Sequence, residues 1–222
     1  MYKRDYLFYL ADSYYRDEPH FLEAKAAYLA GRAEPIIPHK PGYDIEPAEL
    51  ASKIGYSAMR SGSYAEAEKY LREAISITEA DKDSTRKMAN DGRANFCLDA
   101  LAECDIRQNR LAEAQSKINE RLKRIKLSSV DGSVEWYLLF NHAMLQEKLG
   151  KFSEAEDYYK RAIAQHEQDD KNRGALPNSS KDNNRMLAYA LREYARFLRT
   201  QKRGSESFDL MDRAVGIMNN AP

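Results

Sequence analysis

Small and hydrophobic residues recur along the chain in five blocks of fourteen residues that align without gaps. They stand at the third, sixth, tenth and thirteenth places, with Gly204 and Arg121 as exceptions, and this spacing describes one face of a helix. The pattern predicts five amphipathic helices, each with a small residue at the centre of its buried face. The blocks are 19–32, 62–75, 109–122, 150–163 and 202–215, and their sixth-place residues are Ala24, Ala67, Ala114, Ala155 and Ser207.

A second helix is predicted before each block, because another small residue precedes it at a fixed distance. In four blocks this residue lies twelve positions before the sixth place, and in the first block Ala11 lies thirteen before Ala24. Two helices joined by a short turn can approach closely where small residues meet. The sequence therefore predicts an all-α chain built of antiparallel helix pairs. The four residues are Gly55, Ala102, Ala143 and Ala195.

These spacings resemble the tetratricopeptide repeat family. In that family a small residue of the first helix is followed twelve positions later by Ala, and seven later by another Ala. Arg121 departs from the pattern, so the second helix of the third repeat is expected to be more exposed or shifted, and Gly31 departs in the first repeat. The matching triplets are Gly55/Ala67/Ala74, Ala143/Ala155/Ala162 and Ala195/Ser207/Ala214.

The resemblance implies an alpha-alpha superhelix of about five antiparallel helix pairs, forming a single repeat domain over residues 1–222. Successive blocks are 41 to 52 residues apart, which is longer than the standard unit of about 34. Part of the excess falls in a proline-rich connector, 33–47, and in a polar segment, 168–184, that is expected to be a disordered loop. The approximate repeats are 4–36, 48–81, 85–127, 133–169 and 185–220.

Charge and hydropathy limit the partners and the cellular location that we expect for the chain. Lys plus Arg and Asp plus Glu both number 35, so no net charge attracts the chain to nucleic acid or to an anionic membrane. No stretch approaches the roughly 18 apolar residues that span a bilayer, and charges interrupt any signal-peptide core at the start. We expect no nucleic-acid partner, no membrane insertion and, by default, a cytoplasmic location. A targeting segment upstream of Met1 would not be visible here.

No constellation of residues predicts catalysis, so we expect that the chain is not an enzyme. A glycine-rich phosphate loop, a His-Glu-x-x-His helix and a Cys-x-x-Cys pair are all missing from the sequence. Cys97 and Cys104 lie two helical turns apart among apolar residues, which favours buried thiols. We expect no catalytic residue, no metal site and no cofactor.

The family resemblance implies that first helices line a concave groove. Aromatic and arginine side chains carry much of the binding energy at interfaces, so those at inward positions are candidates for partner contact. Two alternatives stay open: one is that the aromatics pack repeat against repeat, and the other is that a cation at the end of a helix complements the helix dipole. The candidates are Tyr56, Arg60, Arg107, Tyr137, Phe140, Met144, Lys148, Tyr189, Arg192, Arg196 and Arg199.

The arginines of the fifth repeat form a stripe, because Arg192, Arg196 and Arg199 follow spacings of four and three. One hypothesis is that the stripe receives an acidic partner segment, since guanidinium forks bind carboxylates in two-point contacts. The other is a solvated face balanced by intramolecular pairs. Glu147 is expected to be able to reach the stripe, whereas Glu193 is expected to point elsewhere.

The leading functional hypothesis is a non-enzymatic protein–protein interaction module that binds a peptide or protein in its groove. The alternative is a structural scaffold that self-associates through its terminal helices. The last helix favours the alternative, because it is more apolar than a solubilising cap needs to be. We therefore expect a monomer or a weak homodimer. The apolar residues of that helix are Phe208, Leu210, Met211, Val215 and Met218.

Overall fold

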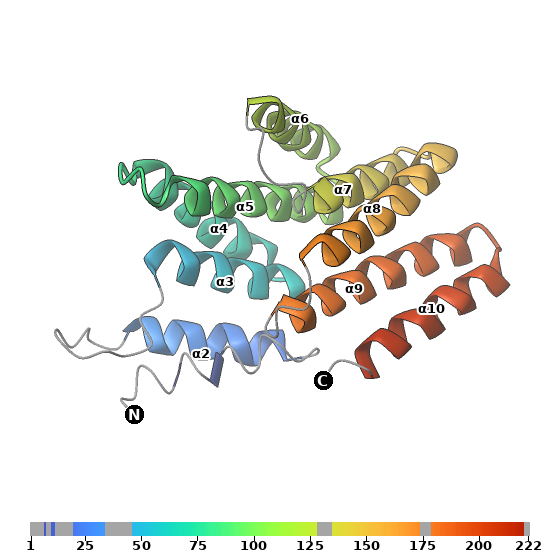
Figure 1. Cartoon of the computed structure of the whole chain (residues 1–222), viewed down its shortest axis with the longest axis horizontal. Coiled ribbons are helices and arrows are strands. Elements are labelled where there is room, and N and C mark those ends of the chain that lie inside the picture. The colour runs from blue at the N-terminus through green and yellow to red at the C-terminus, as the bar shows by residue number, and fades with distance from the viewer. Residues whose placement is uncertain are drawn as a thin grey trace. The chain divides into compact units, whose positions relative to one another are not determined.

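Helices are the regular secondary structure of the described residues, which confirms the predicted fold class. This computed structural model describes residues 7, 10–11, 20–33, 46–127, 135–173 and 179–219, and within them it contains helices and no strand (Figure 1). The helices are α2 (Phe21–Ala33), α3 (Pro47–Arg60), α4 (Tyr64–Ala80), α5 (Lys87–Arg107), α6 (Leu111–Leu127), α7 (Glu135–Lys148), α8 (Phe152–Arg173), α9 (Ser179–Thr200) and α10 (Gly204–Asn219).

The chain forms two compact units, Met1–Lys117 and Ile118–Pro222, and the boundary falls within α6. In the first unit α2 packs on α3, α3 on α4 and α4 on α5. In the second unit α7 packs on α8, α8 on α9 and α9 on α10. The prediction of a single repeat domain over 1–222 stays a prediction.

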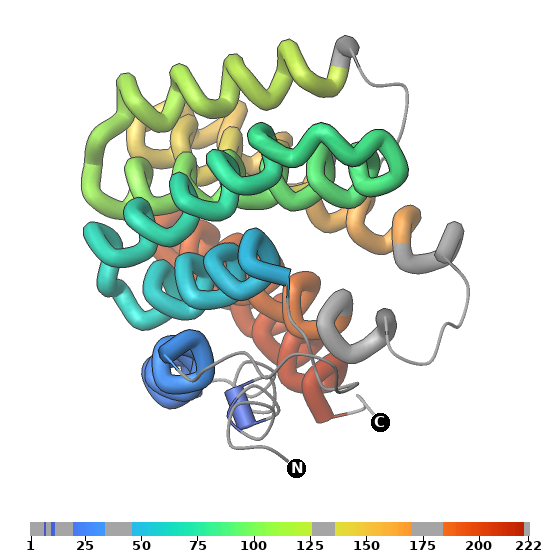
Figure 2. The backbone as a smooth tube through the Cα atoms, turned by 90° about the vertical axis from the view of Figure 1, so that its left-hand side faces the viewer, coloured from blue at the N-terminus to red at the C-terminus, as the bar shows by residue number. Residues whose placement is uncertain are grey.

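In the four pairs whose turn the structure describes, the chain reverses through three residues. Figure 2 shows the reversal between α5 and α6. The middle residue of the turn has a positive φ of 61–79°, and it is Gly62, Asn109, Gly150 or Lys202. The residue after it donates a backbone hydrogen bond to the carbonyl five positions earlier, as from Ser63 to Ala58 at 2.8 Å. This left-handed stop ends the first helix and directs the chain back along it, so the pairs are antiparallel.

The small residues lie where the two helices of a pair cross, as the spacing predicts. Ala67, Ala114 and Ala155 are fully buried. The Oγ of Ser207 donates a 2.8 Å hydrogen bond to the carbonyl of Ala195, its partner residue on the preceding helix. A hydroxyl therefore fits at a crossing when it finds a backbone acceptor.

One expectation about the connecting segments is corrected by the structure, and others concern residues that the structure does not describe. The segment 168–184 is not a loop throughout, because α8 continues to Arg173 and α9 begins at Ser179. No Gly or Pro interrupts the sequence of α8, so nothing in it forces an earlier end. The first helix of repeat 4–36 and the connector 33–47 lie largely outside the described residues.

Candidate partner-binding surfaces

The aromatic residues predicted for the later repeats are buried within the second unit. Tyr137, Phe140, Met144 and Tyr189 all belong to its core. The ring of Phe140 lies 5.3 Å from that of Tyr189, so the two join α7 to α9. In this structure the four side chains pack helix against helix, and a partner could touch them only after local opening.

Tyr56 is likewise buried, in the first unit, and it organises the candidate Arg60. Its ring lies 6.2 Å from Phe21 and 5.4 Å from Phe96, so it joins three helices. The Arg60 guanidinium lies 5.2 Å from the centre of the Phe21 ring and donates a 3.4 Å hydrogen bond to the Tyr56 hydroxyl. Arg60 is therefore held against aromatic faces by cation–π attraction.

Arg107 neutralises a buried carboxylate. Its Nε donates a 2.8 Å hydrogen bond to Glu103, one turn earlier on α5, and the Glu103 side chain is almost fully buried. On the same helix the buried Asp105 is paired with Arg110 and Lys117. Because a buried charge is costly unless it is paired, these cations are needed by the fold itself.

Arg196 is occupied by two carboxylates. Its Nη1 and Nη2 donate to the two oxygens of Glu147 at 2.8 and 2.7 Å, which confirms that Glu147 reaches the stripe. Its Nε donates to Glu193 at 3.0 Å, so the expectation that Glu193 points elsewhere is wrong. Residues three apart are neighbours on a helix surface, and this spacing brings Glu193 to Arg196. The hydrogen bond with Glu147 raises the pKa of Arg196 further above its ordinary value.

Tyr159 extends this network into the core of the second unit. Its hydroxyl donates a 2.9 Å hydrogen bond to Glu147, and its ring is fully buried. Burial, followed by the charge of Glu147, raises the pKa of Tyr159 well above its ordinary value. The Glu147 carboxylate thus accepts from both a guanidinium and a phenol, and it joins α7, α8 and α9.

A second network joins α8 to the turn before α10. Glu156 accepts hydrogen bonds from Arg203, from Lys160 at 2.7 Å and from the Tyr194 hydroxyl at 3.2 Å. The Arg203 hydrogen bond is the main reason that the pKa of Glu156 falls from its ordinary 4.5 to about 2. The ionised form of Glu156 is therefore favoured by folding.

Acidification should destabilise the second unit through Glu156. A carboxyl whose pKa is lowered by folding stabilises the protein above its unfolded pKa, and this contribution is lost as the pH falls through the folded value. The free energy of unfolding should therefore decrease between about pH 4.5 and pH 2. Urea unfolding of the wild type and of Glu156→Gln across this range measures the effect. An equally steep decrease in the variant would contradict the assignment.

Two candidate cations are exposed and form no ion pair with any residue that the structure describes. They are Lys148, the last residue of α7, and Arg199, in the last turn of α9. Arg192, one turn before Arg196, is partly buried. In the second unit, Lys148 and Arg199 are thus the predicted cations whose charges are not already used within the described fold.

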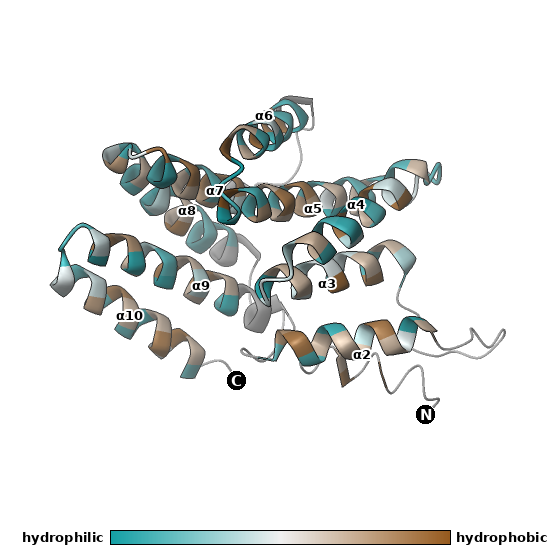
Figure 3. Ribbon diagram, turned by 180° about the vertical axis from the view of Figure 1, so that it is seen from behind, coloured by the Kyte–Doolittle hydropathy of each residue, from teal (hydrophilic) through white to brown (hydrophobic). Residues whose placement is uncertain are grey.

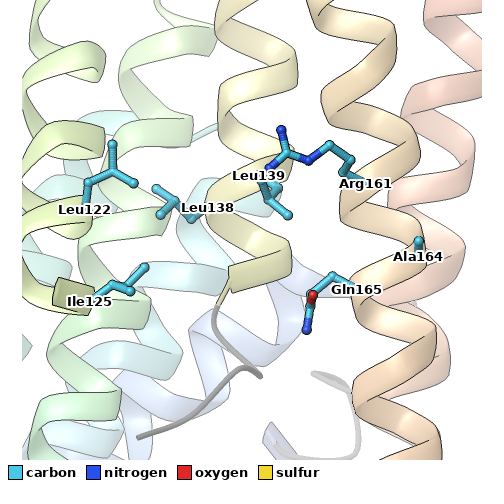
Figure 4. A pocket seen from close by; sticks show the side chains of 7 residues that line it. All are labelled: Leu122, Ile125, Leu138, Leu139, Arg161, Ala164 and Gln165. Atoms are coloured by element: carbon cyan, nitrogen blue, oxygen red, sulfur yellow. The ribbon is translucent and has the colours of Figure 1, made fainter. Parts of the chain in front are cut away.

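An apolar pocket with one charged side chain lies between α6, α7 and α8, and all of its lining residues belong to the second unit (Figure 4). Its volume is about 460 Å³. Arg161 at its edge lies 3.5 Å from Asp157 and 5.2 Å from the centre of the Tyr158 ring. The guanidinium is therefore already placed between an anion and an aromatic face. The lining residues are Leu122, Ile125, Leu138, Leu139, Arg161, Ala164 and Gln165.

Arg121 departs from the repeat pattern on α6, the helix that contributes Leu122 and Ile125 to the pocket. It stands at the place that holds Ala74 and Ala162 in other blocks, and only 1% of its surface is exposed. Arg121 itself is buried rather than exposed, but a guanidinium needs more room than a methyl group. The next residue, Leu122, is exposed, whereas the equivalent Ile163 is buried. Arg121 therefore marks α6 in the sequence as different from the other second helices, whereas the pocket was not predicted from the sequence.

Comparison with known proteins supports the repeat assignment. Residues 48–81 and residues 138–173 each match a sequence model described as a tetratricopeptide repeat. A search of curated proteins found no significant match. The crystal structure of the apo form of RapI is similar over 99% of this chain and 72% of that chain, with a TM-score of 0.58 and 14% identity. At this identity the likeness shows the fold.

A second solved structure, described as MamA MSR-1 C2, covers 100% of this chain and 97% of that chain. Its TM-score is 0.41 and its sequence identity is 16%.

In the part of the chain that is described, no helix is long and apolar enough to cross a membrane.

Proposed function

Because the chain carries tetratricopeptide repeats, we propose that it is a non-enzymatic interaction module that binds a peptide or another protein. Two matched repeats and an all-helical fold similar to that of RapI support this proposal. When helix pairs stack, the first helices of successive pairs lie side by side. Their C-terminal ends then form an extended surface that a partner can contact.

We place the contact on the C-terminal turns of α7 and α9, at Lys148 and Arg199. The observation that carries the proposal is the contrast between these two cations and Arg196. Arg196 is already bound by Glu147 and Glu193, whereas Lys148 and Arg199 are exposed and unpaired within the described residues. When a partner covers a cation that has no ion pair within the protein, the cost of removing water from that cation is offset only by an anion of the partner. An acidic segment is therefore the partner that fits.

The buried candidates have a supporting role in this proposal. Phe140 and Tyr189 hold α7 against α9 with their rings 5.3 Å apart. The network of Glu147, Arg196 and Tyr159 fixes the same two helices to α8. Rigid neighbours reduce the entropy that Lys148 and Arg199 lose when they bind a partner.

Charge reversal at both exposed cations should abolish partner binding without unfolding the protein. The Lys148→Glu/Arg199→Glu variant should recover at least about tenfold less partner from a native cell extract, which corresponds to roughly 1.4 kcal/mol. Quantitative mass spectrometry of the captured proteins gives the measurement. The circular dichroism spectrum of the double variant should match that of the wild type, because neither side chain is buried.

A control with the same change of net charge separates a specific surface from general electrostatics. Lys82 and Lys87 are exposed cations of the first unit, outside the proposed surface, and Lys82→Glu/Lys87→Glu should retain the partner. Partner recovery should also fall as salt screens the contact. If the Lys148/Arg199 variant captured the same proteins in the same amounts as the wild type, the proposed surface would be wrong.

A further inference from the structure

Helix α10 leaves an apolar face uncovered. Phe208, Met211 and Val215 are 72%, 38% and 52% exposed, and their spacings of three and four residues place them on one side of the helix. The adjoining side of α10 carries the buried Ser207 and Ala214, and the helix packs on α9 (Figure 3). Three exposed apolar residues in line are a sign of an interaction surface.

The aligned blocks show what this face does elsewhere in the chain. Phe208 occupies the seventh place, and the residues at this place in the first, second and fourth blocks all contact the next helix pair. Val215 occupies the fourteenth place. In the first block the residue at this place also contacts the next helix pair, because Arg32 donates a 2.6 Å hydrogen bond to Glu73. The seventh-place contacts are Lys25 with Glu66, Glu68 with Arg110, and Glu156 with Arg203.

The face of α10 is thus equivalent to the face through which α4 packs on α5 and α8 packs on α9. A helix-packing surface is complete only when another helix covers it. The occupant that fits is therefore a helix with an apolar stripe, lying along α10.

The chemistry at the seventh place distinguishes among possible helices. In the first, second and fourth blocks a charge stands there, and each pairs with an opposite charge on the following pair. In an antiparallel contact between two copies centred on the tenth place, the seventh place of one copy faces the fourteenth place of the other. The first block would then bring together two cations, Lys25 and Arg32, and the second and fourth blocks would bury a carboxylate against an isoleucine. Phe208 and Val215 are both apolar, so this contact is self-complementary in α10 and in none of those blocks.

We propose that α10 packs antiparallel on α10 of a second copy of this chain, with Phe208, Met211 and Val215 at the contact. The interface is isologous, since the same three residues contribute from both sides. It uses a surface different from Lys148 and Arg199, so it does not depend on the proposed partner-binding function.

The size of the contact predicts a weak and reversible dimer. A helix of 16 residues is about 24 Å long. One helix face of this length buries less than the roughly 1,200 Å² of total surface that stable complexes need. Association is therefore expected at protein concentrations of about 10 μM or above, where sedimentation velocity can follow it.

Substituting a charge on the apolar face should abolish association. Phe208→Glu would bury a carboxylate against Val215 of the second copy and should remain a monomer at concentrations where the wild type dimerises. The matched control is Met88→Glu, which adds the same charge at an equally exposed apolar residue of α5, 71% exposed, and should dimerise as the wild type does. Circular dichroism of both variants should equal that of the wild type.

A cysteine placed near the middle of α10 provides a second readout. Met211→Cys should form an intermolecular disulfide with its own copy under mild air oxidation, in which oxygen takes up the two electrons and two protons of the thiols. Met88→Cys should cross-link far less, and so should Phe208→Glu/Met211→Cys. The native Cys97 and Cys104 should not interfere, because burial hides them and raises the pKa of their thiols to about 11 and about 12.

Three outcomes would overturn the proposal. One is a wild type that stays monomeric throughout the concentration series. Another is a Phe208→Glu variant that still dimerises. The third is a monomeric wild type whose captured protein is lost in Phe208→Glu, which would assign the face to a different partner.

Discussion

Replacing Gly55 with Ala should lower the free energy of unfolding of the first unit by about 1–3 kcal/mol, although Ala is the better helix former. A Cβ at Gly55 would lie 2.7 Å from Cγ of Leu71 and 3.0 Å from its backbone nitrogen. The backbone of α4 cannot yield as a flexible side chain can, so the crossing of α3 and α4 must open. Urea unfolding followed by circular dichroism measures the change.

The same substitution at Gly92 should have the opposite sign. Gly92 lies within α5, and a Cβ there would meet no atom within 4 Å. Gly92→Ala should therefore stabilise by about 0.5–1 kcal/mol, through helix propensity alone. Equal effects of the two substitutions would show that Gly55 is not a contact between backbones.

Reversing the charge of Arg196 should lower the free energy of unfolding of the second unit by about 2–3 kcal/mol. Breaking a buried ion pair costs about 3–5 kcal/mol, and the partial exposure of Arg196 reduces this. In Arg196→Glu the carboxylate of Glu147, mostly buried, would face a second carboxylate and lose both of its guanidinium hydrogen bonds. Thermal unfolding of the variant provides the measurement.

Two further variants test the cause. Arg199→Glu changes the same charge at an exposed residue of the same helix and should alter stability by less than about 0.5 kcal/mol. Exchanging the pair, as Arg196→Glu/Glu147→Arg, should recover part of the loss. A full loss in Arg199→Glu would point to the net charge of α9 instead.

Arg196 also changes how the arginine stripe can be tested. Reversing the charges of Arg192 and Arg196 together is the experiment that the stripe alone suggests. We expect this double variant to lose stability, because Arg196 holds α9 to α7 through Glu147. Loss of partner binding in that double variant would be confounded with loss of stability. Lys148 and Arg199 avoid this problem.

The helix pairs and their crossing points could be predicted from the residue pattern alone. Gly55, Ala67 and Ala155 were assigned to crossings because the requirement for a small side chain recurs at fixed intervals. The turn is similarly local, since a positive φ favours Gly62 or Gly150 over residues with a Cβ. Such features depend on neighbours a few residues away, so their periodicity is visible in a single sequence.

Which of the predicted binding residues are open to a partner could not be read from that pattern and depends on how the helices pack. Tyr137 and Phe140 have the residue types of an interface, and so do the rings of a core, so the sequence could not separate the two roles. Likewise, Arg196 and Arg199 are alike in sequence, yet only Arg196 meets Glu147, 49 residues earlier in the chain. Whether a charge is used within the fold depends on contacts between helices, and these contacts exist only after the pairs have packed.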